Sequence, residues 1–182
     1  SRGLGDVYKR QEHEVNKRMN MADQIPAERI TGAIARMFIE RGDACLREFT
    51  LRSGRRVDLI AIGSGGEITI VEVKSSRQDF ISDRKWHEYP EWADRFYFAV
   101  AEGFPRDLLP GPDESGIIIT DGFDCLEVQP APLAKLAGQR RNHLTRRLAH
   151  VAMRRIEFGI AAGLDVEIDE LMADEAADAL PA

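Results

Sequence analysis

Two apolar segments with charged residues inside them place the strongest constraint on how this chain can fold. Residues 56–62 and 67–74 are rich in Val and Ile, and Gly63-Ser64-Gly65-Gly66 between them predicts a tight reversal. The two segments are therefore expected to pair as neighbouring strands. Three charged side chains fall within them: Asp58, Glu72 and Lys74. Burying such side chains in a strand is costly unless another group compensates their charge.

The turn also predicts the register of the two strands. A reversal centred near Gly65 places Asp58 opposite Glu72, and Lys74 shares their face because side chains alternate along a strand. Two opposed carboxylates repel each other, but a divalent cation between them removes this objection, since Mg²⁺ binds carboxylate and carbonyl oxygens. An ammonium group two residues further on could orient or activate a water. The pattern thus predicts a metal-dependent site that cleaves phosphodiester bonds.

Length and composition favour one domain of a soluble, cytoplasmic protein. The 182 residues can bury a substantial core, and no apolar run is long enough to cross a bilayer. Cys45 and Cys125 each fall in an expected strand, so we interpret them as reduced core residues rather than a disulfide.

The charge of the chain is unevenly distributed. The net charge is −6, but residues 156–182 hold eight acidic side chains and no Lys or Arg. Residues 1–155 hold 25 basic and 23 acidic side chains, a net charge of +2. Residues 135–155 contain no acidic side chain and seven Lys or Arg, which is typical of a surface that attracts phosphate.

The remaining patterns predict the order helix, three strands, helix, strand, hairpin, helix. The expected elements are a helix at 26–41, strands at 44–51, 56–62 and 67–74, a helix capped by Ser75 or Ser76, a strand at 95–101, hairpin strands at 116–120 and 123–128, and a helix at 133–158. A meander followed by a helical crossover implies an α/β fold with a mixed central β-sheet flanked by helices.

The two ends of the chain look unlike the rest. Ser1–Gln11 resembles a translated sequencing-adapter remnant, so residues 1–20 are interpreted as a non-native or disordered leader, with Met19 or Met21 as the expected start. Residues 163–182 are acidic and rich in Ala, which predicts a disordered tail. The folded domain is expected at residues 22–158.

Asp58 followed by Glu72-Val73-Lys74, with a helix on either side, resembles the PD-(D/E)XK nuclease superfamily, whose fold is restriction-endonuclease-like (α-β-β-β-α-β-β-β-α). Longer phrases resemble the MmcB family of DNA repair proteins over about residues 22–158. They are Val71-Glu72-Val73-Lys74-Ser75-Ser76, Asp79-Phe80, Lys85-Trp86, Glu88-Tyr89 and Asp94-Arg95-Phe96-Tyr97-Phe98-Ala99-Val100. The proline of the superfamily's name is absent, since Val57 precedes Asp58.

The resemblance implies a role for each residue of the motif. Asp58, Glu72 and the Val73 carbonyl would bind Mg²⁺, with Mn²⁺ as a substitute, and Lys74 would position the attacking water or stabilise developing charge. Many superfamily members add a glutamate from the first helix, and Glu28 matches that place. An acidic residue in the first turn of a helix is also favoured by the helix dipole alone, so both interpretations of Glu28 stay open.

Contacts to nucleic acid are expected from polar and basic residues around the motif. On the helix after it, Gln78 and Lys85 could touch phosphate, although plain surface positions are the commoner case. The basic stretch adds Arg140, Arg141, Arg146 and Arg147, for which a solvated face or a partner of the acidic tail is the alternative. Trp86, Tyr89 and Trp92 recur at helical spacing and are interpreted as core rather than as a base-stacking surface.

These observations favour a Mg²⁺-dependent DNA endonuclease acting in DNA repair, with DNA and other repair proteins as partners and no membrane. The first alternative is a catalytically inactive adaptor of the same fold that binds DNA or recruits repair proteins. The second alternative is a nuclease directed at RNA. Many relatives of the fold act as homodimers, but the sequence shows no interface.

Overall fold

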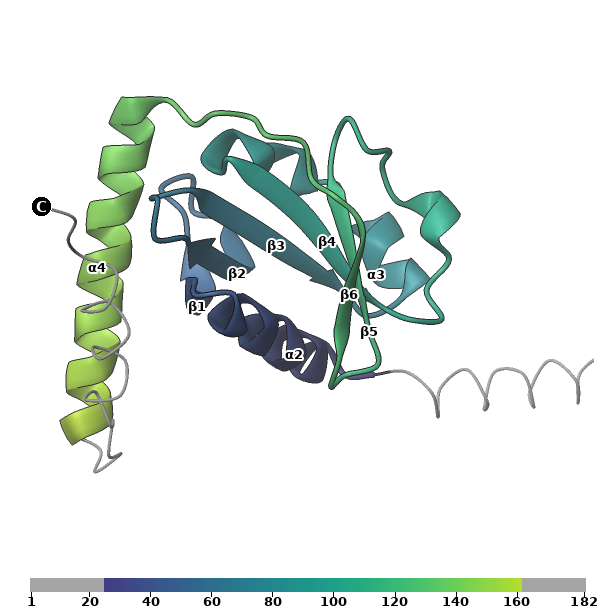
Figure 1. Cartoon of the computed structure of the whole chain (residues 1–182), viewed down its shortest axis with the longest axis horizontal. Coiled ribbons are helices and arrows are strands. Elements are labelled where there is room, and N and C mark those ends of the chain that lie inside the picture. The colour runs from purple at the N-terminus through teal and green to yellow at the C-terminus, as the bar shows by residue number, and fades with distance from the viewer. Residues whose placement is uncertain (1–24, 162–182) are drawn as a thin grey trace, which may run out of the picture. The chain divides into compact units, whose positions relative to one another are not determined.

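A computed structural model of the protein describes residues 25–161. The expectations for residues 1–20 and 163–182 lie outside this range. The described residues divide into two compact units, at 25–140 and 141–161. The first unit contains a six-stranded sheet, and the second is the larger part of a single helix (Figure 1).

The sheet is mixed, as predicted. Its strands are β1 (Ala44–Thr50), β2 (Arg56–Ile62), β3 (Ile68–Lys74), β4 (Arg95–Ala101), β5 (Gly116–Thr120) and β6 (Cys125–Gln129). They lie in the order β1-β2-β3-β4-β5-β6, with β3, β4 and β5 parallel and the outer pairs antiparallel. The expected α/β fold with a mixed sheet flanked by helices is therefore confirmed.

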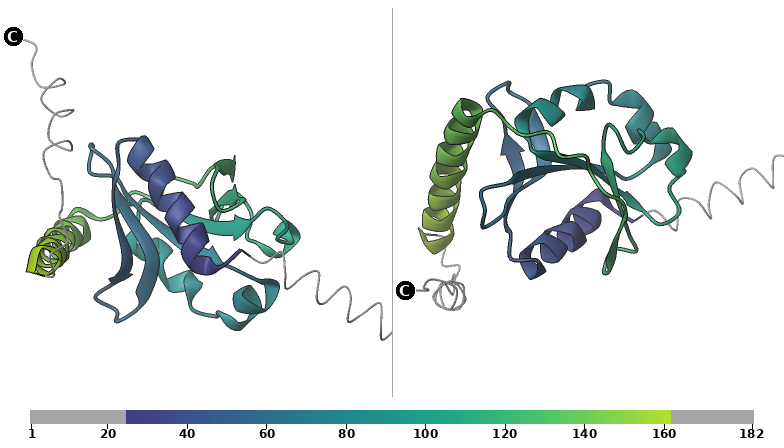
Figure 2. Two further views of the ribbon diagram at one scale, coloured as in Figure 1. Left: turned by 90° about the horizontal axis from the view of Figure 1, so that it is seen from below. Right: turned by 45° about the horizontal axis from the view of Figure 1, so that its top comes forward.

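Helix α2 (Ala27–Glu40) covers one face of the sheet (Figure 2). Its buried stripe of Ile30, Ile34, Met37 and Phe38 packs against odd-numbered side chains of the central strands, including Leu59 and Val71. The helix ends in a Schellman motif. The amide of Gly42 donates to the Ile39 carbonyl and that of Asp43 to the Phe38 carbonyl, and Gly42 has a φ of 86° that suits glycine.

The opposite face carries an aromatic layer beneath short helical turns. These are α3 (Arg77–Ser82) and the 3₁₀ turns Trp86–Glu88 and Pro90–Trp92. The Trp86 ring lies 5.2 Å from that of Phe98, and Phe80 meets Phe98 at 5.5 Å. Trp86 and Tyr89 are buried, which confirms their interpretation as core residues, whereas Trp92 is only half-buried.

Strand β3 is buried along its whole length, charged residues included. It lies between an antiparallel and a parallel neighbour, with α2 on one face and the aromatic layer on the other. A strand covered on both faces is expected to be a continuous apolar run. Glu72 and Lys74 break that run, so their charges must be compensated inside the protein.

The last helix, α4 (Gly138–Ala161), begins five residues later than predicted. Asp94 explains the difference. Its backbone carbonyl accepts from the Ala134 amide and its Oδ1 from the Leu136 amide, so these residues bond to Asp94 and form no helical turn. The other carboxylate oxygen of Asp94, Oδ2, accepts from the Ile68 amide and so also binds the first residue of β3. None of the helices among residues 25–161 has an apolar stretch sufficient to cross a bilayer.

A close approach at Gly116 gives a test of the packing between β4 and β5. A Cβ atom at Gly116 would lie 2.2 Å from the Tyr97 ring and 2.8 Å from the Ala131 amide nitrogen. We expect Gly116→Ala to lower the free energy of unfolding by about 1–3 kcal/mol or more, because the backbone and ring must move apart. Urea denaturation measures the change.

The matched control is Gly65→Ala, because a Cβ there meets no atom within 4 Å. Its stability should stay within about 1 kcal/mol of the wild type. Equal effects of the two substitutions would show that the close contact of Tyr97 with Gly116 does not prevent a larger side chain at position 116.

Candidate functional site

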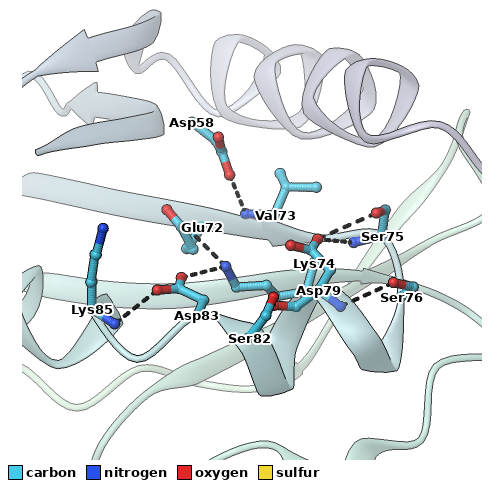
Figure 3. A network of polar contacts seen from close by, with 10 residues as sticks. All are labelled: Asp58, Glu72, Val73, Lys74, Ser75, Ser76, Asp79, Ser82, Asp83 and Lys85. Carbon is cyan, nitrogen blue, oxygen red and sulfur yellow. Dashed lines mark hydrogen bonds and ion pairs between the residues drawn. The ribbon is translucent and has the colours of Figure 1, made fainter.

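The predicted register of the central strands is confirmed. Leu59 pairs with Val71 and Ile60 with Ile70, and the ladder stops one residue before Asp58 and Glu72, which the same register would set opposite each other. Since the odd-numbered neighbours face α2, Asp58, Glu72 and Lys74 all belong to the face that carries α3. The three residues of the motif are therefore brought together at the end of β3 (Figure 3).

Lys74 is held by two carboxylates. Its Nζ atom lies 3.0 Å from Glu72 Oε1 and 2.6 Å from Asp83 Oδ2. The side chains of Lys74 and Glu72 are only 4% and 8% exposed, and that of Asp83 is 16% exposed. An ion pair this well shielded is little weakened by solvent, and loss of one partner would leave a buried charge uncompensated.

Asp83 was missed by the sequence analysis. It follows α3 directly, at the C-cap, and its Oδ1 accepts from the Lys85 amide at 2.8 Å. The helix after the motif was expected to be interrupted only before Pro90, and a helix of that length would continue through position 83. Because α3 is only six residues long, the chain leaves the helix at Asp83 and places this carboxylate next to the end of β3.

Asp58 takes the place of a strand partner for β3. The last pair of the ladder between β2 and β3 is Leu59 with Val71, and beyond it Asp58 Oδ2 accepts from the Val73 amide at 2.8 Å. In an extended strand the N–H and C=O of one residue point to the same side. The Val73 carbonyl therefore faces the Asp58 side of the strand, as the predicted ligand set requires.

The electrostatics of the site are dominated by an excess of acid. Burial, and next the charge of Asp58, raise the pKa of Glu72 to about 8 despite the neighbouring ammonium. Burial also raises the pKa of Asp58, although its hydrogen bond from Val73 opposes this. Burial alone would lower the pKa of Lys74, but Glu72 and Asp83 outweigh it and keep the pKa raised, so the ammonium stays charged.

The donor set suits a hard divalent cation. Glu72 Oε2 is buried and has no hydrogen-bond partner, an arrangement that is costly unless a cation or water satisfies the oxygen. Glu72 and Asp83 pair with the one ammonium and Asp58 lies nearby, so the acids outnumber the bases and negative charge is left to be balanced. Residues 25–161 contain no cluster of three or more His, Cys, Asp or Glu side chains arranged as metal ligands. The predicted set instead combines two carboxylates with the Val73 carbonyl.

The side chains of the other predicted site residues do not join the hydrogen bonds of this cluster. Glu28 is exposed in the first turn of α2, whose buried stripe packs on the opposite face of the sheet, and no contact between Glu28 and the motif occurs among the described residues. Gln78 and Lys85 are exposed, on α3 and just after it. Lys85 adjoins the cluster, because its amide donates to Asp83, and both side chains are accessible to a ligand.

The basic residues differ in their surroundings. Arg140, in the first unit, bonds to the Glu91 carbonyl, and its guanidinium lies 5.0 Å from the centre of the Trp92 ring. Arg141, Arg146 and Arg147 belong to the second unit. Arg146 is exposed and the other two are half-buried. Contact of these four arginines with nucleic acid stays a prediction.

Comparison with known proteins identifies the family to which this chain belongs. A family model described as DNA repair protein MmcB-like matches residues 16–162. The chain belongs to this MmcB-like family of DNA repair proteins. A solved structure of a protein of unknown function from Silicibacter pomeroyi is 40% identical, with a TM-score of 0.70, over 80% of this chain and 98% of that one. A search of curated proteins found no match.

The raised pKa of Glu72 predicts how stability depends on pH when no divalent cation is present. The pKa is about 8 in the folded protein and 4.5 as the ordinary value, so the folded state holds the proton more tightly. The stability that this proton contributes is fully present below pH 4.5 and is lost as the pH rises through 8, by up to about 5 kcal/mol. Glu72→Gln should flatten this decline, and above pH 8 the variant should be more stable than the wild type.

Thermal unfolding in chelator between pH 5 and 9 measures this difference. Glu88→Gln is the control, because the Glu88 carboxylate pairs with Arg55 at the surface and should not change the pH profile. Parallel profiles for Glu72→Gln and the wild type would contradict the buried, protonated carboxyl.

Proposed function

We propose that this DNA repair protein is a Mg²⁺-dependent deoxyribonuclease whose reacting centre is formed by Asp58, Glu72 and Lys74. The observation that carries the proposal is the buried oxygen Glu72 Oε2, which has no hydrogen-bond partner and lies in a site with more acids than bases. The orphaned oxygen favours a cation, and the membership of a DNA repair family favours DNA as the substrate.

The ligands would be Asp58, Glu72 and the Val73 carbonyl. Asp58 is half-buried and uses one oxygen for the Val73 amide, so its second oxygen would be the one offered to the cation. Mg²⁺ at this position would polarise the scissile phosphate and lower the pKa of a bound water. Mn²⁺ also accepts carboxylate and carbonyl ligands and is expected to replace it.

Lys74 supplies the positive charge next to these ligands. Because its pKa is raised, the group is an ammonium at neutral pH and a donor rather than a base. An ammonium has three N–H donors, of which Glu72 and Asp83 take two. The third is left for the attacking water or for a phosphate oxygen, whose developing negative charge it would stabilise.

Surface contacts extend the proposal to the rest of the substrate. Gln78 and Lys85 are accessible and would meet the phosphates next to the one that is cut. Arg140, Arg141, Arg146 and Arg147 would add attraction to phosphate that does not depend on sequence. Glu28 stays a candidate for a further acidic residue at the site.

An adaptor without catalytic activity is the second candidate. The observation in its favour is the pairing of Lys74 with Glu72 and Asp83, because a buried network of this kind also serves as a structural element. Such a protein would bind DNA or repair proteins and form no product. A nuclease directed at RNA differs from the main proposal only in substrate.

The decisive experiment incubates the purified protein with branched, nicked, single-stranded and damaged DNA, and with RNA. Each substrate is tested with Mg²⁺, with Mn²⁺ and with chelator. We expect cleavage of at least one DNA with either cation and none with chelator. Asp58→Asn and Glu72→Gln should each lower the rate by at least about 100-fold, because both remove a ligand oxygen.

The asparagine and glutamine variants keep the shape of the side chains. Asp58→Ala would leave the Val73 amide without its acceptor and destabilise the sheet by about 1–3 kcal/mol, which would confuse loss of activity with loss of fold. Glu88→Gln again serves as the control. Binding of DNA without product under every condition favours the adaptor, and cleavage of RNA alone favours the second alternative.

A further inference from the structure

The segment from Lys74 to Asp83 forms a short loop, which is closed by the ion pair between these two residues. From Lys74 the chain passes through Ser75 and Ser76, forms α3 and reaches Asp83, whose Oδ2 atom lies 2.6 Å from the Lys74 ammonium. We propose that Asp83 is a positioning residue that holds the Lys74 ammonium at the reacting centre. This inference rests on the proposed nuclease function and names a residue beyond its predicted motif.

The loop is held at both ends. At its start, Ser76 Oγ accepts from the Asp79 amide at 3.1 Å and the Asp79 carboxylate accepts from the Ser75 amide at 3.1 Å. At its end, Asp83 Oδ1 accepts from the Lys85 amide at 2.8 Å. In the middle, Phe80 packs edge-to-face on Phe98 at 5.5 Å. Packing and hydrogen bonds that do not involve Lys74 therefore fix the position of the Asp83 carboxylate.

Lys74 needs a second partner because its stem is flexible. A lysine ammonium is a compact charge on four methylene groups, and one carboxylate does not fix its direction. With Glu72 alone, the ammonium would be drawn to the carboxylate that is proposed to bind the cation. The shorter contact to Asp83, 2.6 Å against 3.0 Å, draws it the other way. Glu72 Oε2 is thereby left for the cation.

Asp83→Asn tests this inference, because the amide oxygen can still accept from Lys85 while the charge is lost. We expect the single-turnover cleavage rate to fall by about 10- to 100-fold, as for other groups that orient a catalytic residue. Affinity for Mn²⁺, measured by calorimetry, and affinity for DNA should change by less than about twofold. Asp83→Glu should recover part of the rate, and Glu88→Gln should cleave like the wild type.

A double-mutant cycle separates positioning from an independent role. If Asp83 acts through Lys74, the variant with both Lys74→Met and Asp83→Asn should be no slower than Lys74→Met alone. A measurement that does not need activity is the nitrogen-15 NMR signal of the Lys74 ammonium. Its hydrogens should exchange slowly in the wild type and at least tenfold faster in Asp83→Asn.

Each other outcome overturns the inference in a distinct way. A fall in Mn²⁺ affinity equal to the fall in rate would make Asp83 a metal ligand. Additive effects in the cycle, an unchanged rate, or an unchanged ammonium signal would remove its link to Lys74. If the wild type itself forms no product, the proposed function fails and this inference fails with it, whereas an active wild type with a fully active Asp83→Asn overturns this inference alone.

Discussion

The ammonium of Lys74, buried between two carboxylates, is the interaction on which the rest of this molecule depends. A charged group inside a strand covered on both faces is tolerated only with close partners. Glu72 supplies one partner from the same strand, and Asp83 supplies the other from the end of α3. The short helix, its serine cap and the aromatic contact of Phe80 therefore have a common effect, which is to bring an acid back to the end of β3.

The two faces of the sheet have different tasks. The face toward α2 is apolar and closely packed, and it contains none of the three residues of the motif. The other face combines an aromatic layer with the charged cluster at the end of β3. The alternation of a strand therefore separates the charged side chains from the apolar ones that pack under α2.

The sequence predicted the sheet well, because its strands and turns depend on local patterns. The Val- and Ile-rich segments and the glycine-rich turn were enough to predict the strands and the register that pairs Leu59 with Val71. Asp83 was not predicted, since its place depends on where α3 ends, and that end is determined by tertiary packing. The start of α4 was predicted too early for a similar reason. Asp94, distant in sequence, accepts hydrogen bonds from the amides of the residues that were expected to form the first turn of α4.

The bond between Asp58 and the Val73 amide links ligand binding to the sheet itself. Where a backbone carbonyl would normally hold β3 to its neighbour, a side chain does so, and that side chain belongs to the proposed ligand set. Any ligand that fixes the Asp58 carboxylate therefore also tightens the edge of the strand pairing, and any ligand that withdraws it opens the sheet at that point. The Val73 amide is thus a natural reporter of occupancy, since its rate of hydrogen exchange follows the state of a single carboxylate.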